Sequence, residues 1–122
     1  MNKPKALKSF WSSFGLKAYN ELTVPADAQM PYITYEQMTS DFDRSVTLTA
    51  SLWYKGTTWD AVNDKASEIE NAIGRGGIFK NFEDGSIWVT LGSPFAQSMG
   101  DEIDSMARRI VLNINAEFIP AE

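Results

Sequence analysis

The alternating run at residues 44–54 constrains the fold more than any other feature of the sequence. Apolar side chains occupy every second position and hydroxyl-bearing residues or a tryptophan lie between them, as Val46, Leu48, Ala50, Leu52 and Tyr54 against Thr47, Thr49, Ser51 and Trp53. A period of two residues is typical of a β-strand with one buried face, because successive side chains point to opposite sides. The run therefore predicts an antiparallel sheet with one face on a core and the other facing water or a second subunit.

Two further segments carry the period of an amphipathic helix. Residues 5–14 place large apolar side chains on one helical face, namely Leu7, Phe10, Trp11 and Phe14. A helix this short does not persist alone in water, so its stripe either packs on the core, which we favour, or docks on a partner. Residues 59–73 repeat the pattern after a cap at Thr57 or Thr58 and before Gly74.

The remaining segments complete one α+β domain that spans residues 1–122. Extended segments are predicted at 18–24, 32–36, 78–82, 86–91 and 107–119. The last of these pairs with residues 44–54 at the centre of the sheet, residues 1–24 form an N-terminal helix and an extended arm, and residues 92–105 form a long loop. The predicted fold is a mainly antiparallel sheet of four to five strands, with the N-terminal helix and a second helix packed on one face.

The residue types that most catalytic and metal sites need are absent. The sequence has no cysteine and no histidine, which excludes disulfides, thiolate nucleophiles, Ser-His-Asp constellations and the usual transition-metal sites. Paired carboxylates are the one catalytic device left, and they occur in polar segments with nothing to bury them, as Asp41, Asp43, Asp101, Glu102 and Asp104. We therefore predict no enzymatic activity, no cofactor and no bound metal.

Charge and hydropathy narrow the choice of partners. The formal net charge is −5 and there is no basic run, so specific binding to nucleic acid is not expected. No apolar run approaches the roughly 18–20 residues that cross a membrane, and we expect the protein to assemble in a cytosol. The glycines of residues 74–77 follow a helix and lack the ending of a phosphate-binding loop, so we expect a turn there.

Several side chains suit a protein interface better than chemistry. Trp53 and Trp88 occupy the faces of their strands opposite the apolar ones, where aromatic rings often contact a partner. Arg108 and Arg109 point to opposite faces of one strand, so they form no phosphate-binding patch, and we expect ion pairs with carboxylates of a neighbouring subunit. The predicted interface is completed by three residues of the 92–105 loop, Pro94, Phe95 and Gln97.

Five strings of sequence, together with the helix-first layout, carry a family resemblance. They are residues 24–35, 48–54, 72–77, 93–97 and 108–113. Through them most of the chain from about Pro25 onward resembles the tail terminator, or tail completion, proteins, which are minor tail proteins of long-tailed bacteriophages. The first twenty residues are similar to that family only in general character.

The resemblance implies a structural protein of the virion, placed in the tail or neck after assembly in the host cytoplasm. Members of the family form a hexameric ring that caps the tail tube, stops its polymerisation and presents a face to the connector of the head. The implied partners are further copies of the chain, the tail tube protein and the head-side connector protein. DNA only passes through the lumen, and neither a membrane nor a cofactor takes part.

The ring hypothesis gives the acidic loop a role and leaves two alternatives open. Asp101, Glu102 and Asp104 are predicted to line the lumen, where negative charge would keep passing DNA from adhering. A head-closure or connector protein of the same virion is the first alternative. A protein-interaction module of a cellular complex is the second.

Overall fold

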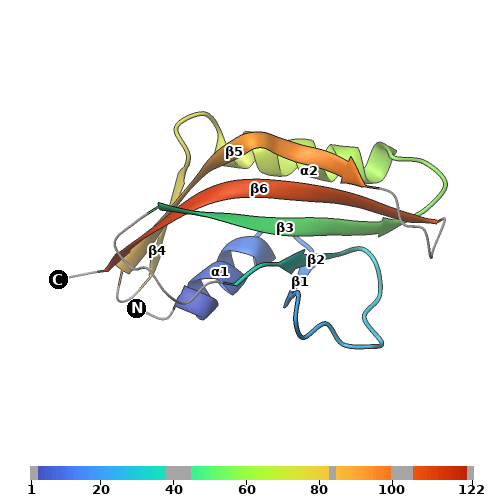
Figure 1. The fold of residues 1–122 in the computed structure, drawn as a ribbon, viewed down its shortest axis with the longest axis horizontal. Coiled ribbons are helices and arrows are strands. Elements are labelled where there is room, and N and C mark those ends of the chain that lie inside the picture. Colours follow the sequence, from blue (N-terminus) through green and yellow to red (C-terminus); the bar gives the residue numbers. More distant parts are fainter. Residues whose placement is uncertain (1–2, 38–44, 83–84, 100–105, 121–122) are drawn as a thin grey trace.

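Two helices and six strands follow one another in the computed structural model, which describes residues 3–37, 45–82, 85–99 and 106–120 (Figure 1). In chain order they are α1 (Lys3–Ser12), β1 (Lys17–Asn20), β2 (Tyr32–Tyr35), β3 (Ser45–Lys55), α2 (Asp60–Ile73), β4 (Ile78–Phe82), β5 (Gly85–Met99) and β6 (Ala107–Pro120). Each corresponds to a segment predicted from the sequence, although α1 ends at Ser12 and not at the predicted Phe14, and the ends of β1 and β5 also differ from the prediction.

The strands form one curved sheet in the order β1-β2-β3-β6-β5-β4 (Figure 1). Only the neighbours β1 and β2 are parallel, and every other neighbouring pair is antiparallel. β3 and β6 lie at the centre, and their pairing runs from Ser45 opposite Glu117 to Lys55 opposite Ala107. The α+β class and the central pair are therefore confirmed, and the described chain has six strands where four to five were predicted.

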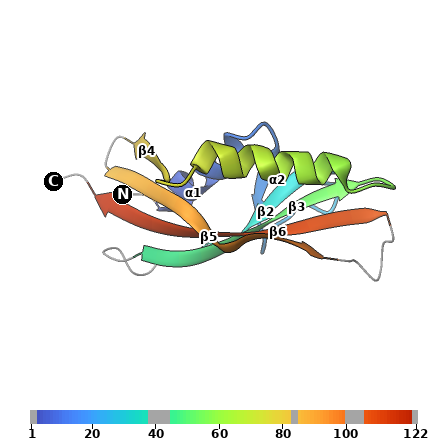
Figure 2. The same ribbon diagram turned by 90° about the horizontal axis from the view of Figure 1, so that it is seen from above.

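Both helices cover the same face of the sheet (Figure 2). Their buried side chains join those of the strands in a single core cluster, to which α2 contributes Val62, Ala66, Ile69 and Ile73. In the described parts of the chain no helix covers the opposite face. A two-layer fold of this kind buries one face of the sheet and leaves the other free for solvent or a partner.

The aromatic stripe of α1 and of the turn after it, which contains Phe14, belongs to the core. Leu7, Phe10 and Trp11 are fully buried and Phe14 is nearly so. The rings of Phe10 and Trp11 meet edge to face with centroids 4.9 Å apart, and those of Phe10 and Phe14 do so at 5.4 Å. Core packing, the use that we favoured for this stripe over a docking face, is confirmed.

The predicted cap of α2 is wrong. The helix begins at Asp60, the capping position is Trp59, and no side chain makes a capping hydrogen bond. Trp59 packs partly buried against the core, which sets where the helix starts, and Asp60 places a carboxylate in the first turn, where the helix dipole favours negative charge. The other end lies where predicted, since the helix ends before Gly74 and the N–H of Gly74 donates to the carbonyl of Glu70 at 2.9 Å. Gly74 has a positive φ of 71°, but its ψ of 175° is not that of the expected left-handed helical residue.

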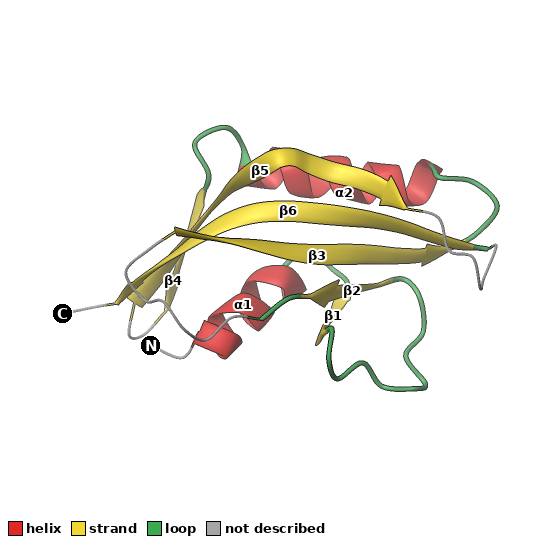
Figure 3. Ribbon diagram, viewed as in Figure 1, coloured by secondary structure: helices red, strands yellow, loops and turns green. Residues whose placement is uncertain are grey.

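β1 is shorter than the extended arm predicted for residues 18–24. The carbonyl of Asn20 accepts the N–H of Thr23 at 2.9 Å, and its side-chain Oδ1 accepts the N–H of Leu22 at 3.0 Å. Asparagine stabilises such turns by bonding its own following backbone. The strand therefore ends at Asn20, and a loop leads back to the start of β2 (Figure 3).

The long loop predicted for residues 92–105 is wrong over its first half, because β5 continues to Met99. Leu91 pairs with Ile114 and Ala96 with Leu112, so residues 92–95 bulge opposite Asn113 alone. The bulge is closed by a 2.9 Å hydrogen bond from Asn113 Nδ2 to the carbonyl of Pro94. Such an insertion breaks the period of two on which a strand prediction depends. Residues 100–105 of the predicted loop lie outside the described residues.

Candidate functional site: a bare sheet face and two open edges

The helix-free face has an uncharged polar strip at its centre. The strip consists of exposed and partly exposed residues of β3 and β6, namely Thr47, Thr49, Asn113 and Asn115. Ser51 continues the row on β3 but is buried. Thr47 Oγ1 donates to Asn115 Oδ1 across the two strands at 3.0 Å. A surface of hydroxyl and amide groups offers hydrogen bonds to a partner without the cost of desolvating a charge.

Trp53 and Arg109 form one cluster beside this strip, and Trp53 lies on the predicted second face of its strand. The guanidinium of Arg109 lies over the Trp53 ring at 4.7 Å, and its Nε donates to Ser51 Oγ at 3.1 Å. Trp53 Nε1 donates to Thr34 Oγ1 at 2.9 Å. The ring of Tyr32 adjoins Trp53 with centroids 6.5 Å apart, so the cluster spans from β2 to β6. Both predicted interface residues are thus held in place by their own chain.

Arg108 lies on the other side of the sheet, where its guanidinium stands 5.5 Å from the centre of the Trp59 ring. The prediction that the two arginines point to opposite faces is confirmed. Arg108 is partly buried beside the start of α2, in surroundings unlike those of Arg109. The ion pairs predicted for both residues with a neighbouring subunit stay a prediction.

Trp88 lies at the far lateral end of the same helix-free face. Its ring stacks on Phe79 of the neighbouring strand with centroids 5.6 Å apart and an interplanar angle of 5°. Its Nε1 donates to the carbonyl of Gly76 at 3.1 Å. Phe79 is 58% exposed and was missed in the sequence, because only the register between β4 and β5 sets it directly opposite Trp88.

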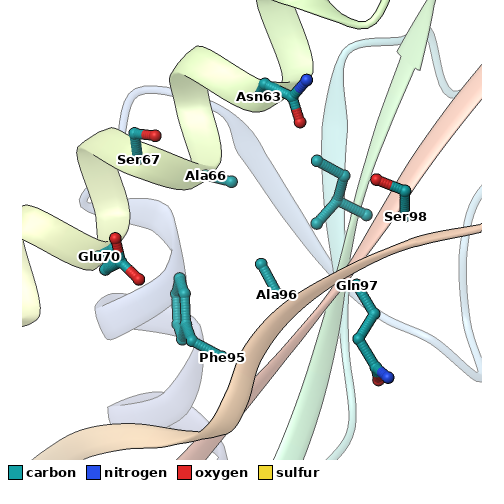
Figure 4. Close-up of a pocket in the computed structure, with 9 residues that line it drawn as sticks. Asn63, Ala66, Ser67, Glu70, Phe95, Ala96, Gln97 and Ser98 are labelled. Carbon is teal, nitrogen blue, oxygen red and sulfur yellow. The ribbon is translucent and has the colours of Figure 1, made fainter.

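A hollow of about 260 Å³ separates the second half of β5 from α2. Figure 4 shows Asn63, Ser67 and Glu70 along one side of α2, opposite Ala96 and Ser98 of β5. β4 pairs with β5 only from Gly85 to Val89, so in the described chain this later part of β5 has a strand neighbour on one side only. We call the segment Ala96–Met99 with this hollow the β5 edge.

The three interface residues predicted around this edge differ in their surroundings. Pro94 and Gln97 are exposed, and the Gln97 side chain points away from α2 (Figure 4). Phe95 is only 7% exposed and belongs to the core cluster. Its prediction as an interface residue in a loop is therefore wrong, because the bulge turns this ring inward against the apolar side of the sheet.

The opposite end of the sheet is formed by β1. A hollow of about 520 Å³ adjoins it, with Lys8 and Ser12 of α1 on one side and Lys17 of the strand on the other. A second hollow of about 390 Å³ follows, which Lys17 shares with Asp27 of the next loop. We call Lys17–Asn20 with the first hollow the β1 edge, which carries positive charge where the β5 edge carries Glu70.

Two of the described tyrosines have pKa values raised by their surroundings. Burial raises the pKa of Tyr35, and burial together with the charge of Glu68 raises that of Tyr54, so both phenols stay protonated at neutral pH. Among residues 3–37, 45–82, 85–99 and 106–120, no three carboxylates are grouped to hold a metal ion. The acids predicted from the sequence lie outside the described residues, as Asp41, Asp43, Asp101, Glu102 and Asp104.

Replacing Arg109 with alanine is expected to lower the free energy of unfolding by about 1–2 kcal/mol. The substitution removes a cation–π contact worth about 0.5–1 kcal/mol at a part-exposed site and a hydrogen bond of about 1 kcal/mol. Urea denaturation followed by tryptophan fluorescence measures the change. The matched control is Arg75→Ala in an exposed turn, which should change stability by less than about 0.5 kcal/mol. Equal effects of the two substitutions would contradict the assignment.

No similar protein was found for this chain. In the described chain no helix is both long enough and apolar enough to span a membrane. The chain matches no protein-family model, no curated protein and no solved structure.

Proposed function

We propose that this chain is a structural protein of a bacteriophage virion, whose copies form a ring that caps the tail tube and joins the tail to the head. The proposal starts from the sequence resemblance to tail terminator proteins. One feature of the fold supports it above the others: among the described residues no helix covers the second face of the sheet, and both β1 and the later part of β5 have a described strand neighbour on one side only, in unlike surroundings.

Unlike edges suit a ring for a geometric reason. When one patch of a subunit contacts a different patch of the next, the contact repeats around a rotation axis and closes into a ring if the rotation fits. The aromatic clusters at Trp53 and Trp88 stand toward opposite lateral ends of the bare face. Tryptophan, tyrosine and arginine are the residues that most often dominate binding energy at interfaces, so both clusters are suited to contacts within a virion.

The proposal that the acidic residues between β5 and β6 line the lumen of the ring is supported by their charge. Asp101, Glu102 and Asp104 give the chain a concentrated negative charge between two strands. In a ring through which DNA passes, negative charge facing the lumen repels phosphate and prevents adhesion. The tail tube protein and the head-side connector protein are the proposed partners on the two faces of the ring.

The experiment is native mass spectrometry of the purified protein, alone and mixed with isolated tail tubes, followed by negative-stain imaging. We expect six copies in a ring with a hole wide enough for duplex DNA, bound to one end of the tube. Rings that bind the head-side connector and ignore tubes would instead identify a head-closure protein. A chain that remains monomeric both alone and with tubes would contradict the proposal and favour a cellular interaction module.

A further inference from the structure

We propose that neighbouring copies join head to tail through their sheets, with the β1 edge of one copy paired antiparallel to the β5 edge of the next. This inference rests on the proposed ring and names the surfaces that would close it. The occupant of each edge is a second copy of this chain. The contact would carry the sheet, and the helix layer above it, from one subunit into the next.

The first support is that each edge has one side that faces no described strand. β1 is the terminal strand of the described sheet and has β2 as its one described neighbour. Ala96–Met99 pairs with β6 on one side and faces no described strand on the other. Edge strands present a row of backbone N–H and C=O groups that a strand of another chain can pair with.

The second support is charge. The hollow at the β5 edge contains Glu70 of α2 and no basic residue, and the first hollow at the β1 edge contains Lys8 of α1. Lys17 adds a second positive charge to that hollow, although the sheet register sets its side chain on the helix-free face and it also borders a second hollow with Asp27. Joining unlike edges brings these opposite charges together. Joining like edges would set carboxylate against carboxylate or lysine against lysine, so charge disfavours a two-fold dimer and favours the head-to-tail contact.

The third support is the position of the helices. Lys65 of α2 donates to the carbonyl of Phe14 at 3.0 Å, so this flank of α2 faces the N-terminal segment of its own copy. Asn63, Ser67 and Glu70 lie on a different flank, above the β5 edge (Figure 4). Lys8 and Ser12 of α1 lie beside the β1 edge. The joined edges would therefore bring α1 of one copy next to the Glu70 flank of α2 of the other.

The direction of the strands follows from the sheet. β1 is parallel to β2, and the successive antiparallel steps through β3 and β6 to β5 leave β1 antiparallel to β5. Rotation about an axis parallel to the strands does not change strand direction. β1 of one copy is therefore also antiparallel to β5 of the next copy. The new ladder is therefore antiparallel, like most of the ladders within the subunit.

The test uses the full chain, which has no cysteine of its own. Lys17→Cys and Gln97→Cys each place a thiol on an exposed residue, and the sheet register sets both on the helix-free face. The two single variants are mixed and treated with a short bis-maleimide. We expect a covalent dimer in the mixture and none from either variant alone. The double variant should give a ladder of bands up to the covalent ring.

The matched control replaces the β5 partner with Asn81→Cys, an exposed residue of β4 on the same face. Cross-linking of Lys17→Cys to this position in preference to Gln97→Cys would overturn the inference, and so would dimers from a single variant alone. Rings seen by native mass spectrometry without the Lys17–Gln97 product would overturn the inference and leave the proposed function standing. Absence of both rings and cross-links would contradict the two together.

Discussion

Replacing Phe10 with alanine is expected to lower the free energy of unfolding by about 3–5 kcal/mol, the usual cost of truncating a buried phenylalanine. Phe10 is fully buried and touches both neighbouring rings of the α1 stripe, Trp11 and Phe14. The cavity would lie between α1 and the sheet, and a helix of 10 residues has little stability apart from that packing. Since single domains are stable by about 5–15 kcal/mol in total, the loss would remove a large share of the stability.

The chain provides a matched control for this substitution. Phe79→Ala deletes the same ring from a position that is 58% exposed and stacked on one face of Trp88, and it should cost about 1 kcal/mol or less. Urea denaturation of both variants, followed by circular dichroism, gives the comparison. If Phe10→Ala costs no more than Phe79→Ala, α1 does not pack on the sheet, and its aromatic stripe would return to being a partner-docking face.

The central part of the fold could be predicted from sequence because its periods are long. Residues 44–54 alternate over most of their length and residues 107–119 do so from Leu112 to Phe118. These two segments form the central pair, β3 and β6. The α2 stripe from Val62 to Ile73 keeps a helical period without interruption. In each of these segments the burial of one face decides the local structure, and burial leaves a pattern that can be read along the chain.

The parts of the fold that were not predicted depend on contacts between residues distant in the sequence. The second half of β5 is missed because a bulge interrupts its period, and the strand is held by pairing with β6, which a local pattern does not report. The start of α2 is missed because packing of Trp59 outweighs the capping preference of Thr57 and Thr58.

Part of the candidate site could be predicted from strand alternation, and the rest depends on contacts between distant residues. Strand alternation alone places Trp53 and Trp88 on the face opposite the apolar one and Arg108 and Arg109 on opposite faces, as the structure does. Their partners require the register between strands, since Phe79 meets Trp88, and Thr34 meets Trp53, only once β4 is set against β5 and β2 against β3. The charges at the two edges require more, because Glu70 and Lys8 come from helices whose positions over the sheet the sequence does not state.

Replacing Gly77 with alanine is expected to cost about 2–5 kcal/mol, an effect second only to loss of the Phe10 ring. Gly77 has a φ of +83°, which costs a residue with a side chain roughly 1–2 kcal/mol. A Cβ there would also stand 2.6 Å from both Trp88 Nε1 and the carbonyl oxygen of Val89. Backbone displacement of this kind adds about 1–3 kcal/mol, and it would pull Trp88 from its 3.1 Å hydrogen bond to the Gly76 carbonyl.

The neighbouring glycines separate the cost of a positive φ from the cost of the steric overlap at Gly77. Gly76→Ala meets nothing within 4 Å at a φ that any residue adopts, so it should change stability by less than about 0.5 kcal/mol. Gly74→Ala has room but keeps a φ of +71°, so it should cost about 1–2 kcal/mol from backbone strain alone. Urea denaturation of the three variants should therefore rank Gly77 above Gly74 and Gly74 above Gly76. Equal costs at all three positions would mean that the glycines serve only as a loose turn, and that the close approach of this turn to Trp88 does not hold the aromatic pair in place.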